Sequence, residues 1–87
     1  MQVEAPYFIE FPFLRQMENE AISKNLLYVE YKLPDDSYYQ GYVQNTSKCG
    51  PGVIKWKDGT KYEGEWKDEM RHGKGQLWYP NGDFYEG

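Results

Sequence analysis

Two side chains that commonly bind metals, Cys49 and His72, lie 23 residues apart at matching positions of a repeating pattern. A thiolate and an imidazole are ordinary zinc ligands, each held about 2.0–2.3 Å from the ion. If the chain folds into successive hairpins of one sheet, these positions are separated by two strand spacings, about 9–10 Å. With one Cys and one His in the chain, zinc binding would require a dimer. We therefore expect no metal and no cofactor within one chain.

Catalytic chemistry has little support in the residue pattern. The hydroxyls of Thr46 and Ser47 lack a base at a matched spacing, and His72 lacks a partner that would orient it. Glu63 and Glu65 alternate with lysines, which is typical of a solvated strand face. The Gly-x-Gly pairs precede strands and open no helix, so they do not fit a nucleotide-binding fingerprint. We predict that the chain is not an enzyme.

The elements that would position these side chains follow a 23-residue period. Tyr39, Tyr62 and Tyr85 coincide when the sequence is shifted by 23, and several glycines coincide with them. These glycine matches are Gly41 with Gly64 and Gly87, Gly50 with Gly73, Gly52 with Gly75, and Gly59 with Gly82. A fixed period of this size signals a stacked repeat architecture. The organisation is a half repeat (28–38), repeats at 39–61 and 62–84, and the start of a third (85–87).

Each repeat is predicted to be a β-hairpin with a three-residue loop. Strand-forming residues flank Lys57-Asp58-Gly59. A three-residue loop places Trp56 opposite Thr60 and Ile54 opposite Tyr62, and thereby separates rings from charges on the two faces. The ring face then carries Tyr39, Trp56, Tyr62, Trp66, Tyr79 and Tyr85, and the charged face carries Lys55, Lys61 and Glu63.

Glycines fall opposite one another in this register. Gly64 lies opposite Gly52, and Gly87 opposite Gly75. These pairs leave gaps on the ring face where a neighbouring Tyr or Trp can lie flat across the backbone. We interpret them as packing features.

The string Tyr62-Glu63-Gly64-Glu65-Trp66-Lys67-Asp68, followed by Arg71-His72-Gly73-Lys74-Gly75, resembles the MORN (membrane occupation and recognition nexus) repeat. The resemblance covers about residues 28–87, and it departs from the family pattern at 45–49. It implies a mostly β fold: an elongated, twisted, single-layer antiparallel sheet without catalytic activity. Family members serve as scaffolds, membrane tethers, axonemal components and accessory segments of enzymes.

Aromatic residues are the best candidates for a binding surface. On the charged face Trp78 falls opposite Phe84, and Tyr28 falls opposite Tyr42. Exposed ring pairs are common anchors of interfaces. The rings of the ring face form a second candidate, a continuous strip that could cradle a helix or an extended peptide. The predicted contacts to a protein partner are Trp56, Tyr62, Trp66, Trp78, Phe84 and Tyr42.

Lipid binding is the alternative. It would use Lys55, Lys57 and Lys61, because anionic membranes attract clustered lysines. Glu63 and Glu65 partly cancel this patch, so the expected contact with anionic lipid is weak. Residues 1–38 carry seven acidic and three basic side chains, which would repel such a surface. The net charge of −4 also argues against nucleic-acid binding.

Residues 1–27 lie outside the repeats and are rich in rings before Pro12. A short helix is expected over 15–27, with four apolar residues at helical spacing: Leu14, Met17, Ala21 and Ile22. The segment either caps the first hairpin, since end repeats need covering, or anchors to another subunit. We favour the cap.

Both the chain's last strand and its composition bear on its setting. The strand that ends at Gly87 has an unpaired edge, which invites a partner repeat protein, a second copy of the chain, or a longer host chain. A single cysteine fits a reducing compartment. We expect a cytoplasmic scaffold in a cytoskeletal or ciliary assembly; the alternative is a peripheral membrane tether or an accessory module of an enzyme.

Overall fold

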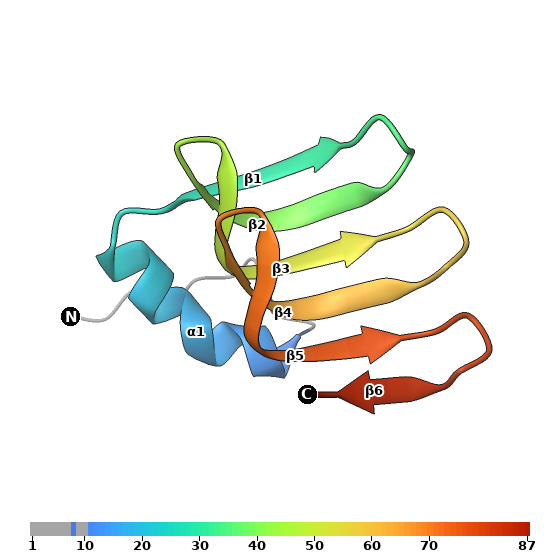
Figure 1. The fold of residues 1–87 in the computed structure, drawn as a ribbon. Coiled ribbons are helices and arrows are strands. Elements are labelled where there is room, and N and C mark those ends of the chain that lie inside the picture. Colours follow the sequence, from blue (N-terminus) through green and yellow to red (C-terminus); the bar gives the residue numbers. More distant parts are fainter. Residues whose placement is uncertain (1–7, 9–10) are drawn as a thin grey trace.

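The computed structural model describes residue 8 and residues 11–87. Six strands form one antiparallel sheet in chain order, and helix α1 (Pro12–Ser23) lies across one of its faces (Figure 1). The strands are β1 (Leu27–Lys32), β2 (Tyr38–Gln44), β3 (Ser47–Lys55), β4 (Lys61–Lys67), β5 (Met70–Trp78) and β6 (Phe84–Glu86). This confirms the predicted fold class, an open antiparallel sheet of hairpin repeats with a short N-terminal helix.

The three-residue loop is confirmed. Trp56 N donates to Thr60 O (2.8 Å), Gly59 N donates to Trp56 O (3.0 Å), and Ile54 faces Tyr62. The same pair of hydrogen bonds closes loops 33–37 and 79–83, and the three turns line one side of the sheet in Figure 1. Gly59 has φ +99°, and Asp36 adopts φ +70° at the same position of the first loop. The type I turn with a following left-handed residue therefore recurs at each repeat.

Tyrosines occupy the gaps that the paired glycines leave. A Cβ atom on Gly52 would lie 2.8 Å from Tyr39 Cε1, and one on Gly75 would lie 2.5 Å from Tyr62 Cε1. Each tyrosine also donates its hydroxyl hydrogen to a carbonyl three residues ahead: Tyr39 to Tyr42 O (2.7 Å) and Tyr62 to Glu65 O (3.1 Å). The packing role predicted for the glycines is confirmed, because a side chain there would collide with a ring.

The opposite ends of the hairpins differ from the loops that the sequence suggested. Two-residue turns at Asn45-Thr46 and Asp68-Glu69 join β2 to β3 and β4 to β5, and all four residues have φ between +50° and +71°. The register shifts next to Gly41 and Gly64, and β3 and β5 bend away from the sheet there (Figure 1). We call these two turns, with the strand residues that flank them, the hairpin tips.

Helix α1 begins and ends earlier than expected. Pro12 stands at the first helical position, where its missing N–H has no partner to lose. At the other end Asn25 adopts φ +61°. Asn25 N donates to Ile22 O and Leu26 N to Ala21 O, both at 3.0 Å, which is the Schellman arrangement that ends a helix. The stop at Asn25 leaves Ile22 exposed.

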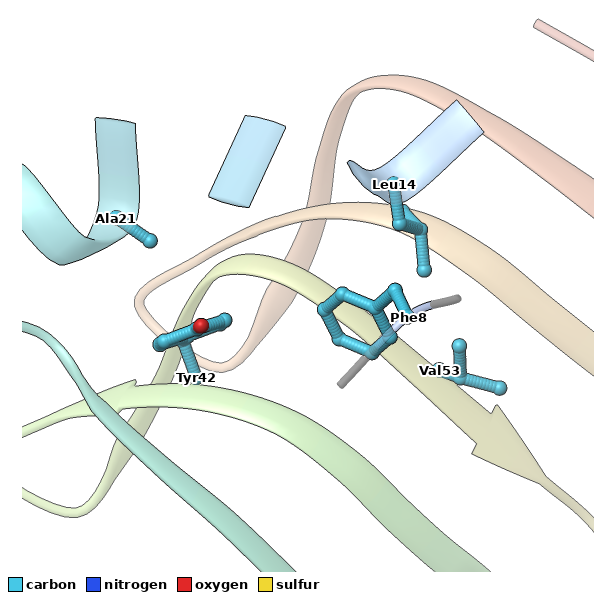
Figure 2. Packing of buried hydrophobic residues seen from close by; sticks show 5 residues of the cluster. All are labelled: Phe8, Leu14, Ala21, Tyr42 and Val53. Atoms are coloured by element: carbon cyan, nitrogen blue, oxygen red, sulfur yellow. The ribbon is translucent and has the colours of Figure 1, made fainter. Parts of the chain in front are cut away.

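The core has two parts, one on each face of the sheet. On the charged face α1 covers a cluster made of Phe8, Leu14, Ala21, Tyr42 and Val53 (Figure 2). On the ring face the hairpin tips fold over a second cluster made of Tyr39, Val43, Ile54, Tyr62 and Trp66. Rings make up much of both clusters, as the aromatic content suggested, and both faces are covered toward the N-terminal end of the sheet.

Candidate functional site

The aromatic pair Trp78 and Phe84 lies opposite on β5 and β6, as predicted. The ring centroids are 4.3 Å apart, and the two residues are 36% and 45% exposed. Lys61 Nζ lies 5.4 Å from the Trp78 ring centroid and 5.2 Å from that of Phe11. The pair is therefore held by its neighbours while one side stays open to solvent, as an interface anchor requires.

Strand β6 forms an open edge beside this pair. It pairs with β5 on one side and with no other described strand. Gly75 and Gly87 exchange reciprocal backbone hydrogen bonds of 3.1 Å, so the ladder stays regular to its last residue. The outward N–H and C=O groups can accept a further strand. Tyr85 on β6 is exposed on the ring face, so rings flank this edge on both faces.

The ring face is not the continuous strip that the sequence suggested. Tyr39, Tyr62 and Trp66 are buried because the hairpin tips fold over them, and Trp66 Nε1 donates to Gly52 O (3.3 Å). Trp56 is half-buried, and Tyr79 and Tyr85 are exposed. Beside Tyr85 lies a cavity of about 430 Å³ lined by Tyr62, Arg71, His72, Leu77, Tyr79 and Tyr85, with Gly73, Gly75 and Gly87. The face is open at its C-terminal end.

The second ring pair is opposite as predicted but is not an exposed pair. The Tyr28 and Tyr42 ring centroids are 5.5 Å apart, yet Tyr42 is 1% exposed. It lies under Phe8 and α1, and its hydroxyl donates to Glu18 Oε2 (3.1 Å). Burial raises the pKa of Glu18, with the hydrogen bond from Tyr42 opposing. Tyr42 belongs to the core, and its prediction as an exposed anchor is wrong because the helix covers it.

A buried ion pair joins the two hairpin tips, and the sequence analysis missed it. Lys48 Nζ donates to Glu69 Oε1 (2.9 Å) and Lys48 N donates to Glu69 Oε2 (2.7 Å). The ammonium also lies 5.3–5.9 Å from the ring centroids of Tyr31, Tyr39 and Trp66. Burial opposes ionisation of Glu69, but the bonds from Lys48 outweigh it and lower the carboxyl pKa. The signal lay in an unlike-charge pair 21 residues apart, close to one period.

The candidate lipid-binding lysines do not form one uniform patch. Lys55 and Lys57 are exposed, whereas Lys61 is half-buried, with its Nζ 3.8 Å from Glu63 Oε2. Glu63 is 6% exposed, so its interpretation as a solvated carboxylate is wrong. Burial raises the Glu63 pKa, and Lys61 opposes the shift. Two freely exposed lysines remain for an anionic surface.

Cys49 and His72 line one cavity of about 310 Å³ between α1 and strands β3 to β5, together with Glu20 and Lys24 of the helix. Within residues 8 and 11–87, no group of three or more Cys, His, Asp or Glu side chains is placed to hold a metal ion. The same part of the chain has no helix of the length and apolarity needed to cross a membrane.

Comparison with known proteins adds a family. The family model described as MORN repeat matches residues 39–61 and 62–84, the two 23-residue periods. Similar proteins include Alsin from Rattus norvegicus and Homo sapiens, each 45% identical over 55 residues, and Alsin from Mus musculus, 43% identical over 55. The aligned region covers 58% of this chain and 3% of each Alsin, so the chain spans a small part of these relatives' length.

Proposed function

The chain belongs to the MORN repeat family, and on that premise we propose that it is a scaffold module that binds protein partners through the C-terminal end of its sheet. MORN repeats are generally non-catalytic, and their family is consistent with membrane or protein interaction. The proposal adds the location of the surface and the class of partner.

One observation carries the proposal: an open strand edge flanked by exposed rings on both faces. Trp78 and Phe84 lie on the charged face, Tyr85 lies on the ring face, and β6 leaves its outward backbone groups unpaired within the described chain. An added strand would gain a hydrogen-bonded ladder and apolar contacts together, which is how edge-pairing interfaces obtain affinity and specificity. The surrounding charges are mixed, which favours a protein partner over an anionic membrane.

Trp56, Tyr62 and Trp66 enter the proposal in different ways. Tyr62 contributes to the wall of the open cavity, and Trp56 is half-buried on the same face. Trp66 lies inside the core, so its replacement should act through stability. We place the direct contacts at Trp78, Phe84 and Tyr85. A cytoplasmic setting in a cytoskeletal or ciliary assembly, and self-association through β6, belong to the same proposal.

Affinity capture from the native cell type tests the proposal. The bait is the full chain, the test variant is Trp78→Ala with Phe84→Ala, and the matched control is Tyr38→Ala. Tyr38 is an exposed ring on β2, away from the C-terminal edge. We expect a defined set of proteins that the control retains and the double variant loses, with all baits folded by circular dichroism. Equal capture by the two variants would contradict the proposed surface.

A lipid-tether function is the second candidate, and exposed Lys55 and Lys57 favour it. Phosphatidylserine vesicles, pelleted with the chain at low and high salt, measure it directly. Retention that salt releases, and that Lys55→Glu with Lys57→Glu abolishes, would support the tether because surface attraction is screened by salt. The scaffold proposal expects little retention at either salt concentration.

A further inference from the structure

Lys48 and Arg71 occupy equivalent positions in successive repeats, 23 residues apart. Lys48 Nζ lies 5.3 Å from the Tyr39 ring centroid, and Arg71 Cζ lies 5.5 Å from the Tyr62 ring centroid. Tyr39 and Tyr62 are themselves one period apart. Each cation therefore sits over the tyrosine of its own repeat, near the glycines that seat that ring.

The Lys48 position is complete because the next hairpin covers it. Trp66 places its ring centroid 5.7 Å from the ammonium, and Glu69, three residues later, forms the 2.9 Å ion pair. Glu69 N also donates to Lys48 O (3.2 Å). An aromatic residue and a carboxylate on one tip thus bury the cation of the preceding repeat.

The Arg71 position lacks this cover. Arg71 is exposed, and in the part of the chain that the structure describes no carboxylate lies within ion-pairing distance of it. The space that a tip fills over Lys48 is here the cavity of about 430 Å³ between Arg71, Tyr62 and Tyr85. It opens beside β6, where a further strand would pair.

We propose that this cavity is a docking site for a β-hairpin of a partner protein, which pairs with β6 and sets an aromatic ring and a carboxylate, three residues apart, against Tyr62 and Arg71. The inference rests on the proposed function, and it adds the chemistry of the partner. The internal example supplies both the spacing and the charge.

A second copy of this chain does not offer that chemistry. Its Glu69 is already bound to its own Lys48. Its other tip carries Val43 at the phase of Trp66 and Thr46 at the phase of Glu69, so it brings neither a ring nor a charge. The occupant is therefore a hairpin with a free aromatic-x-x-Glu tip.

Binding of a hairpin probe tests the inference. The probe is a fluorescent, backbone-cyclised peptide with the sequence of residues 61–78, titrated against the full 87-residue chain. Losing a charged hydrogen-bonded pair should weaken binding about tenfold or more. We expect that loss for Arg71→Ala in the chain and for Glu69→Gln in the probe. Because both changes remove one interaction, their combination should add little. Lys74→Ala, an exposed cation on the same strand, is the control.

A stability measurement covers the case of a probe that does not fold. In a chain where a copy of residues 65–84 follows Gly87, the appended tip reaches Arg71 in the phase of the Trp66–Glu69 tip. Arg71→Ala should then lower the melting temperature by about 4 °C or more, with little change in the 87-residue chain.

Three results would overturn the inference: equal effects of Arg71→Ala on both chains, probe binding insensitive to Arg71, or a dimer of the 87-residue chain that Arg71→Ala dissolves. If probe binding ignores Arg71 but is lost on Trp78→Ala with Phe84→Ala, the docking chemistry fails while the proposed binding surface stands.

Discussion

The ion pair between the hairpin tips should respond unequally to the removal of its two members. The Lys48 side chain is 6% exposed, whereas that of Glu69 is 47% exposed. Glu69→Ala strands an ammonium in the core. Breaking a fully buried pair costs about 3–5 kcal/mol, and nearby rings attract a desolvated cation by up to about 2 kcal/mol. Since water reaches half of Glu69, we expect a loss of about 2–3 kcal/mol.

Lys48→Met should cost less, about 1 kcal/mol, because its apolar stem still packs on the rings and Glu69 can turn to water. The double variant should be more stable than Glu69→Ala alone, since it removes the stranded charge. Urea unfolding followed by tryptophan fluorescence measures all three, with about 4–8 °C of melting temperature per kcal/mol for a domain of this size. A larger loss for Lys48→Met than for Glu69→Ala would refute the reasoning.

Glu69→Gln is the matched control, because it keeps an acceptor oxygen and the side-chain length. The lowered pKa of Glu69 makes its contribution fully present above its ordinary value of 4.5 and lost as the pH falls through the folded-state pKa. The advantage of the native chain over Glu69→Gln should therefore shrink under acid conditions. An advantage that is constant from pH 7 to pH 3 would exclude this linkage.

Three further predictions concern the packing of the sheet and the helix. Gly52→Ala should destabilise by about 3 kcal/mol because its Cβ meets the Tyr39 ring, and Gly82→Ala, with open space but φ +94°, by about 1–2 kcal/mol; urea unfolding ranks them, and an equal loss would argue against the ring seat. Glu18→Gln should stabilise the chain at pH 7, with the gain vanishing below pH 4.5, because burial raises the Glu18 pKa and the native contribution is lost as pH rises through it; melting curves at both pH values test this, and a gain that persists at low pH would disprove it. Asn25→Gly should add about 0.5–1 kcal/mol at a left-handed helix end, and a loss in thermal unfolding would contradict that geometry.

The repeat register could be predicted from sequence because it depends on local rules. Loop chemistry at Lys57-Asp58-Gly59 and the alternation of rings with charges fix which residues face each other. The glycine pairs and the Trp78–Phe84 pair follow from that register, and the structure has them as predicted. These features need no knowledge of what lies above or below the sheet.

Burial on each face could not be predicted in the same way, because it depends on elements that return from a distance. Tyr42 and Glu63 lie on the face that looked polar, and the segment preceding the sheet covers them. Trp66 lies in a covered part of the ring face because β3 and β5 bend at their register shifts. The Lys48–Glu69 pair exists because those bends bring two tips together, and strand alternation alone does not predict such bends.

Site-specific cross-linking tests the central claim most directly, because it records which part of the surface a partner touches. A photoreactive benzoylphenylalanine placed at Tyr85, on the open edge, is compared with one at Leu27, equally exposed on the opposite edge strand. The account predicts covalent adducts with discrete proteins from position 85 and few from position 27. Adducts from position 27 alone, or recovery of the chain with lipid and no protein adduct, would contradict it.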